Sequence, residues 1–185
     1  VYMLYHMLQQ LGRKVALSST VEKIINKDLV KIPLTTPLPD QLHMFLDECV
    51  KRKVEYVILE VSAQALSLCR VSGIEFEAGI FTNFSMEHFE FYRNMREYFQ
   101  AKSLLVAQMK KPQNMFINID DQYGALLKKQ YPSCSTFSLE NKAATMYGWP
   151  HAQKDFVQLY AKINKQTFQF QVPFLGRFNV YNVLG

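Results

Sequence analysis

Short apolar runs alternate with amphipathic stretches along the chain up to Phe137. The stretches with helical spacing of apolar positions are residues 1–11, 42–50, 94–109 and a segment that ends near Gln130. The runs typical of buried strands are Val15–Ser19, Val54–Glu60, Ala78–Thr82, Met115–Asn118 and Cys134–Phe137. This alternation predicts an α/β fold, in which a mostly parallel sheet is flanked by helices and Val54–Glu60 is the central strand.

The pattern changes after Asn141. Met146–Trp149, Phe156–Ile163 and Thr167–Val172 are typical of antiparallel strands, and Asn164-Lys165 suits a tight turn between the last two. These strands predict a small antiparallel annex at residues 145–173. A helix should then begin at residues 176–179, and residues 20–33 are expected to form an exposed excursion.

Composition bounds the class of protein. With 185 residues and 49% hydrophobic content the chain can bury the core of one domain. Its net charge of +5 is spread over short lysine runs, which favours solvated faces over a nucleic-acid surface. No apolar run reaches the roughly 18 residues of a membrane span, and the first residues resemble no signal peptide. Three isolated cysteines indicate reduced thiols in the cytoplasm.

Two apolar runs lead into candidate chemistry. One ends on Glu60, the next leads to His88, and the following predicted helix carries Lys102. Together a carboxylate, an imidazole and a helical lysine suit a Mg²⁺ or phosphate site. Taken singly, each has an ordinary interpretation as an exposed strand end, a structural histidine or a lysine that reaches solvent. An unmodified lysine cannot bind a cation, whereas a carbamylated one can.

Other polar residues have a functional and an ordinary interpretation. The hydroxyls of Thr35 and Thr36 suit phosphate or sugar oxygens, or are simple turn residues. Ser62 is either a ligand donor or a helix N-cap, and Arg70 either binds an anion or lies on the surface. Two further pairs remain open in the same way. Asn179 and Asn182 could contact a base or cap a helix, and Asp120-Asp121 could cap one too.

Several blocks of this sequence, in the same order, resemble motifs of the Mur ligases. Glu60–Leu66 is similar to their Glu-Val-Ser-Ser-His-Ala-Leu motif, and Phe81–His88 to Phe-Thr-Asn-Leu-Ser-x-Asp-His. Further similar blocks are Thr35–Pro37, Ala101-Lys102, Asn118–Asp121 and Gly176–Asn182. Within the family, the set resembles most the branch that adds the third peptide residue to UDP-N-acetylmuramoyl-L-alanyl-D-glutamate. The resemblance implies a P-loop NTPase-like central domain over residues 1–185.

The resemblance also implies a reaction and its residues. ATP would phosphorylate the D-glutamate carboxylate, and a diamino acid, L-lysine or meso-diaminopimelate, would attack the acyl phosphate. This is cytoplasmic peptidoglycan synthesis, on which cell-wall growth, cell shape and cell division depend. Glu60, His88 and carbamylated Lys102 would be catalytic and hold Mg²⁺. Thr35, Thr36, Ser62 and Arg70 would bind the UDP-sugar dipeptide, and Asn179 and Asn182 would lie beside the adenine of ATP.

The sequence also departs from the family. The loop Gly-x-x-Gly-x-Gly-Lys-Thr-Thr, which binds phosphate, is absent and is expected just before Val1. The chain is therefore expected to be an inactive fragment of a longer ligase. Family residues are replaced at Leu34, Gln64, Leu68 and Glu87. Two alternatives stay open: a ligase like folylpolyglutamate synthase, and a non-catalytic remnant that acts as a binding or scaffold module.

Overall fold

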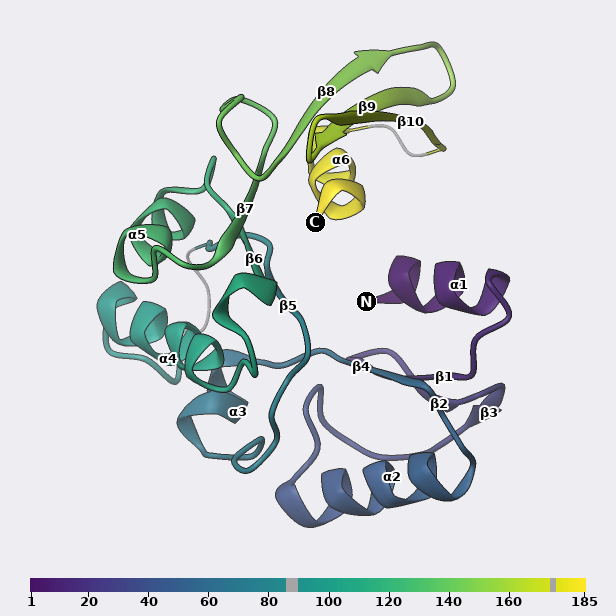
Figure 1. Cartoon of the computed structure of the whole chain (residues 1–185). Helices are drawn as coiled ribbons and strands as arrows, with labels where there is room; N and C mark the ends of the chain where they lie inside the picture. The colour runs from purple at the N-terminus through teal and green to yellow at the C-terminus, as the bar shows by residue number, and fades with distance from the viewer. Residues whose placement is uncertain (86–89, 174–175) are drawn as a thin grey trace. The chain divides into compact units, whose positions relative to one another are not determined.

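The computed structural model describes residues 1–85, 90–173 and 176–185. They divide into two compact units, Val1–Ile74 and Glu75–Gly185. Each unit has its own sheet, of four strands in the first and six in the second (Figure 1). The two units are therefore described one at a time.

The first unit is built on a four-stranded sheet in the order β3-β2-β1-β4. Its elements are α1 (Tyr2–Gln10), β1 (Val15–Ser18), β2 (Lys23–Ile25), β3 (Asp28–Leu29), α2 (Pro39–Lys51), β4 (Tyr56–Leu59) and α3 (Ala63–Ser67). Strands β1 and β4 are parallel, with Ser18 paired to Leu59, whereas β1, β2 and β3 are antiparallel to one another. The carboxyl ends of β1 and β4 therefore lie at the same edge of the sheet.

Both faces of this sheet are covered. On one face Val15 and Leu17 pack with Tyr5 of α1. On the other face Ala16 packs with Phe45 and Cys49 of α2. Alternation along β1 sends successive side chains to opposite faces, which explains why every residue of this strand is buried.

Two expectations for this unit are wrong. Residues 20–33 are not an exposed excursion, because they contain β2 and β3, and all of β2 is buried. The sequence feature that indicates β2 is the apolar dipeptide Ile24-Ile25, whose residues pair with Leu17 and Ala16 of β1. Strand β4 was expected to be central and buried, but it lies last in its sheet, and only Ile58 of it is buried.

The second unit has a six-stranded sheet in the order β10-β9-β8-β7-β6-β5. Its elements are β5 (Gly79–Phe81), α4 (Met95–Ala107), η1 (Pro112–Asn114), β6 (Met115–Asn118), α5 (Gln122–Gln130), β7 (Ser135–Ser138), β8 (Met146–Ala152), β9 (Val157–Ile163), β10 (Gln166–Val172) and α6 (Arg177–Leu184). Strands β5 to β8 are parallel, and β8 to β10 are antiparallel. The expected mostly parallel sheet with an antiparallel part is confirmed.

Local signals in this unit are largely confirmed. Asn94 caps α4 and Asp121 caps α5 through their side chains. Asn164 and Lys165 have φ of 48° and 72°, as a two-residue hairpin turn of type I′ requires. Within α4, Leu104 is 47% exposed.

Helix α6 lies against one face of the antiparallel strands (Figure 1). Val180 packs with Val157 and Leu159, and Leu184 packs with Ala161. A Cβ atom on Gly148 of β8 would lie 2.9 Å from the Leu184 side chain, so the close approach of strand and helix depends on this glycine. Among the described residues, none of the helices has the length and apolar character needed to cross a bilayer.

Candidate functional site

Glu60 follows β4 at the edge where β1 also ends. Its backbone N–H donates to Ser18 O at 2.8 Å, which continues the pairing of the two strands. The carboxylate accepts two hydrogen bonds from Thr20: one from the backbone N–H to Oε2 and one from the hydroxyl to Oε1, both at 3.0 Å. The parallel arrangement thus brings the residues after β1 to the residue after β4.

The Thr35-Thr36 loop docks on the same edge. The Thr35 hydroxyl lies 3.0 Å from the Thr20 hydroxyl. The Thr36 hydroxyl donates to Glu60 O at 2.9 Å and accepts from the Ser62 N–H at 3.0 Å. Thr36 is 1% exposed, so this hydroxyl is committed to the fold. Thr35 is only partly buried, and its hydroxyl faces that of Thr20.

Ser62 and Arg70 complete this group. The Ser62 hydroxyl accepts from the Ala65 N–H at 3.1 Å and caps α3, as the ordinary interpretation predicted. The Arg70 guanidinium donates from Nη1 to Thr36 O at 3.1 Å. Its Nε is buried and has no hydrogen-bond partner among the residues that the structure describes. Glu60, Thr35, Thr36, Ser62 and Arg70 therefore form one cluster, called here the Glu60 cluster.

Lys23 is a member of this cluster that the sequence did not reveal. It is 4% exposed, and its ammonium donates to Ser19 O at 2.6 Å and to Leu34 O. It thereby joins the segment before Thr20 to the segment before Thr35. Burial lowers the pKa of the Lys23 ammonium, and the nearby Glu60 carboxylate opposes this shift. The sequence pattern does not point to Thr20 and Lys23, because it predicts an exposed excursion at residues 20–33.

Lys102 belongs to α4 in the second unit. Its ammonium donates to Asn83 O at 3.3 Å. It also lies 5.7, 5.5 and 5.2 Å from the ring centroids of Phe81, Phe84 and Tyr98, distances at which aromatic faces attract a cation. His88 lies outside the described residues. The predicted site of Glu60, His88 and Lys102 thus involves both units and a residue that is not described, and it stays a prediction.

Few side chains that could bind a metal lie together among the described residues. Within residues 1–85, 90–173 and 176–185, no three His, Cys, Asp or Glu side chains lie together in a way that could hold a metal ion. Glu60 offers carboxylate oxygens, the type of ligand that Mg²⁺ prefers. The described residues alone do not make a complete magnesium site.

Asn179 and Asn182 both lie on α6. Asn179 is partly buried, and Asn182 is exposed. Neither is the cap of this helix, because the N-cap residue is Gly176. The cap interpretation is therefore wrong for both, and contact with a base remains a prediction.

The block Asn118–Asp121 has a structural role. Asn118 Nδ2 donates to Thr82 O at 2.8 Å, and Asp121 Oδ2 accepts from the Phe84 N–H at 3.0 Å. Both bonds hold the segment that follows β5. Asp121 is also the cap of α5 through two further N–H groups. The cap interpretation is thus confirmed for Asp121 but not for Asp120.

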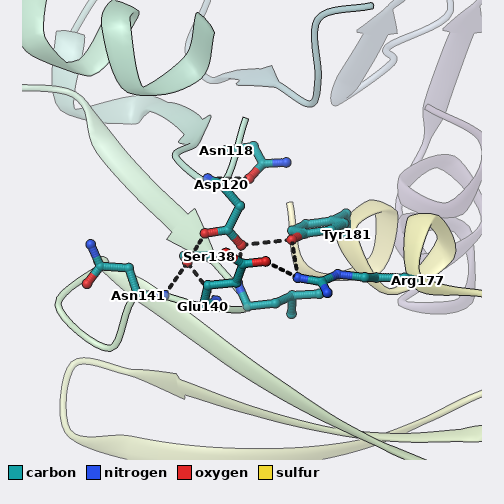
Figure 2. Close-up of polar contacts among 8 residues, drawn as sticks. Asn118, Asp120, Ser138, Glu140, Asn141, Arg177 and Tyr181 are labelled. Atoms are coloured by element: carbon teal, nitrogen blue, oxygen red, sulfur yellow. Dashed lines mark hydrogen bonds and ion pairs between the residues drawn. The ribbon is translucent and has the colours of Figure 1, made fainter. Parts of the chain in front are cut away.

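Asp120 instead is the centre of a hydrogen-bond network (Figure 2). Its carboxylate accepts from the Ser138 hydroxyl, from Leu139 N at 2.7 Å and from Tyr181 Oη at 2.9 Å. Arg177 donates to Tyr181 Oη at 3.2 Å and forms an ion pair with Glu140. Burial raises the pKa of the Tyr181 phenol, which keeps this phenol a donor. This network joins α6 to the ends of β6 and β7.

Comparison with known proteins gives a consistent result. A family model described as the Mur ligase middle domain matches residues 1–185. A UDP-N-acetylmuramoyl-L-alanyl-D-glutamate--2,6-diaminopimelate ligase of Clostridium botulinum is 34% identical over 100% of this chain and 38% of its own length. A ligase of the same name from Fusobacterium nucleatum is 32% identical over 90% of this chain and 34% of its own length.

Solved structures show the same fold. The structure of a ligase with that same name covers 98% of this chain and 38% of its own, with a TM-score of 0.86 and 24% identity. MurF ligase from Thermotoga maritima in complex with ADP covers 98% of this chain and 39% of its own, with a TM-score of 0.65 and 14% identity. At these identities the likeness is one of fold alone.

Proposed function

Because the chain belongs to the Mur ligase middle-domain family, we propose that it is the central part of an ATP-dependent ligase of peptidoglycan precursors. The observation that carries this proposal is the match, over 100% of this chain, to a relative named as a 2,6-diaminopimelate ligase. The chain spans 38% of the length of that relative, so the reaction is proposed for the whole protein. We propose that residues 1–185 form its central domain, with residues 145–173 as an annex.

The proposed reaction has two steps. The terminal phosphoryl group of ATP passes to the D-glutamyl carboxylate of UDP-N-acetylmuramoyl-L-alanyl-D-glutamate and releases ADP. The amine of a diamino acid then attacks the acyl phosphate, and phosphate leaves as the amide forms. Positioning and neutralisation of charge dominate such chemistry. The nucleotide-linked substrates agree with the expected cytoplasmic location.

The Glu60 cluster supports a role in binding the dipeptide substrate. Thr20 and Thr35 place two hydroxyls beside the Glu60 carboxylate. The unpartnered Nε of Arg70 is a buried donor, and such a group is costly unless it gains an acceptor. A carboxylate or phosphate oxygen of the substrate would satisfy it. Ser62 and Thr36, whose hydroxyls already hold the backbone, would act by positioning this edge.

The metal proposal rests on the family resemblance. Glu60, His88 and carbamylated Lys102 would hold Mg²⁺, which when bound neutralises phosphate charge. The described surroundings of Lys102, three ring faces and a carbonyl, suit its ammonium form. The carbamate is tested by mass spectrometry of the intact protein at high bicarbonate, where a lasting absence of the adduct on Lys102 contradicts it.

The nucleotide proposal concerns α6. Asn179 and Asn182 would lie beside adenine, and the Asp120 network would hold their helix. The MurF ligase from Thermotoga maritima, which was solved in complex with ADP, has the same fold, and this supports ATP as the co-substrate. The relatives named above favour this branch over a folylpolyglutamate-type ligase.

An assay of phosphate release tests the function. The full-length protein is supplied with ATP, Mg²⁺, the UDP-linked dipeptide and either meso-diaminopimelate or L-lysine. We expect phosphate release only when all substrates are present, and no release from residues 1–185 alone. Release that is independent of the UDP-linked dipeptide would overturn the proposal, and the preferred amine identifies the added residue.

A further inference from the structure

A row of aromatic rings covers one face of the antiparallel strands. Along β8, Gly148 faces Leu184 of α6. Since side chains alternate along a strand, Tyr147 and Trp149 project from the opposite face. Across the sheet, Tyr147 pairs with Lys162, and Trp149 pairs with Tyr160 of β9. These residues thus share the face that is turned away from α6.

The rings on this face are arranged in parallel. The centroids of Tyr147 and Trp149 are 5.5 Å apart with an interplanar angle of 24°. Those of Trp149 and Tyr160 are 5.7 Å apart at 10°. All three side chains are only partly buried. Aligned, partly exposed rings offer a surface on which another planar group can stack.

A cavity lies beside this row of rings. Its volume is about 390 Å³, and it is lined by Lys142, Tyr147, Trp149 and Lys162. Both lysines are exposed. Neither has an ion-pair partner within the part of the chain that the structure describes. The cavity therefore combines two aromatic rings with two positive charges that no described carboxylate offsets.

We propose that this cavity is a binding site for a nucleoside monophosphate. Its base stacks on the Tyr147 and Trp149 rings, and its phosphate lies between the ammonium groups of Lys142 and Lys162. The volume falls within the range of about 300–1,000 Å³ typical of sites for small ligands. Stacking accommodates any base, whereas lysine binds phosphate as a point charge. The two features together favour a nucleotide over a neutral sugar or a simple anion.

This site is independent of the proposed reaction. The cavity lies on the face of β8 and β9 opposite to α6, which carries Asn179 and Asn182. It contains no residue that the resemblance assigns to ATP, metal or dipeptide. A negative ligase assay would therefore not argue against nucleotide binding in this cavity. Likewise, a negative titration with nucleotide would not argue against the ligase proposal.

Trp149 supplies the test, because it is the one tryptophan in the chain. The chain is titrated with UMP while its tryptophan fluorescence is recorded, and uridine and inorganic phosphate are titrated in parallel. We expect saturable quenching by UMP and at least about tenfold weaker binding of uridine or phosphate. The absence of saturable quenching, or equal affinity for inorganic phosphate, would overturn the proposal.

Matched lysine variants locate the phosphate. Lys142→Gln and Lys162→Gln should each weaken UMP binding by about fivefold, the upper range for an exposed charge pair. Lys165→Gln removes the same charge from the exposed turn between β9 and β10 and should leave binding unchanged. Equal weakening by all three variants would mean unspecific attraction and would contradict the site.

A ring variant and an oligonucleotide separate the remaining outcomes. Tyr147→Ala should weaken UMP binding about tenfold, within the range for loss of base stacking, provided that its thermal melt matches that of the unmodified chain. If Tyr147→Ala does not fold, the variants of the exposed Lys142 and Lys162 still test the site. A single-stranded oligouridine should have an affinity per nucleotide no higher than that of UMP. Binding of the oligonucleotide without binding of UMP would rule out a mononucleotide site.

Discussion

Glu60 and Asp120 are carboxylates that each closely follow a parallel strand, yet they are held in different ways. Both oxygens of Glu60 accept from a single residue, Thr20. Asp120 accepts from three residues, the Ser138 hydroxyl, Leu139 N and Tyr181 Oη, which belong to two segments, the end of β7 and α6. The position after a strand is thus not enough to assign function. We interpret Glu60 as a functional carboxylate and Asp120 as a structural one.

The largest expected effect is that of Asp120→Ala on stability. The variant leaves the fully buried Ser138 hydroxyl, an N–H and a phenol without their acceptor, so we expect a loss of about 3 kcal/mol in the free energy of unfolding. Urea denaturation measures it. Tyr181→Phe removes one of these bonds and should cost about 1 kcal/mol. If Glu60→Gln destabilises the chain as much as Asp120→Ala, the contrast between the two carboxylates is wrong.

The second effect separates two neighbouring threonines of the Glu60 cluster. Thr36→Val keeps the shape but removes a buried hydroxyl that joins Glu60 O to the Ser62 N–H, so we expect a loss of about 1.5 kcal/mol. Thr35→Val removes a partly exposed hydroxyl and should cost less than about 0.5 kcal/mol. In the full-length protein, Thr35→Val should instead raise KM for the UDP-linked dipeptide. Equal stability losses would show that Thr35 is structural too.

A third effect tests strain in the loop of this cluster. Leu34 has φ of 70°, a conformation that asparagine tolerates better than leucine. Leu34→Asn should therefore stabilise the chain by about 0.7 kcal/mol. Leu68→Asn is the matched control, because Leu68 is similarly exposed, 49% against 47%, but has φ of −92°. A gain in the control as large as that of Leu34→Asn would argue against relief of strain.

The smallest effect concerns the pH dependence contributed by Lys23. Because its pKa is lowered in the folded chain, the unfolded chain binds this proton more tightly. The folded state is therefore penalised at neutral pH and regains stability as the pH rises toward the ordinary lysine value. The free energy of unfolding is measured between pH 7 and pH 10 for the unmodified chain and for Lys23→Met. The difference, unmodified chain minus variant, should rise slightly with pH. Lys27→Met, at an exposed position, controls for the removal of one lysine charge from the same unit.

The sequence predicted one of the two clusters far better than the other. The resemblance to the Mur ligases implied that Thr35, Thr36, Ser62 and Arg70 bind one substrate, whereas Glu60 was expected with His88 and Lys102. The structure joins Glu60 to the first group. Lys23 was missed, since only its pairing in β2 shows that its ammonium is buried. The Asp120 network was not foreseen, because Ser138 and Tyr181 lie 18 and 61 residues away. Contacts between distant segments leave no local signal.

The most direct test of a functional Glu60 cluster is ADP release by the full-length protein that carries Glu60→Gln. With ATP, the UDP-linked dipeptide and diaminopimelate, we predict a loss in kcat/KM of about 100-fold or more, the scale for removal of an electrostatic group from such a site. Glu75→Gln, at an exposed position, should retain full activity. Turnover by Glu60→Gln equal to that of the unmodified protein would contradict the account.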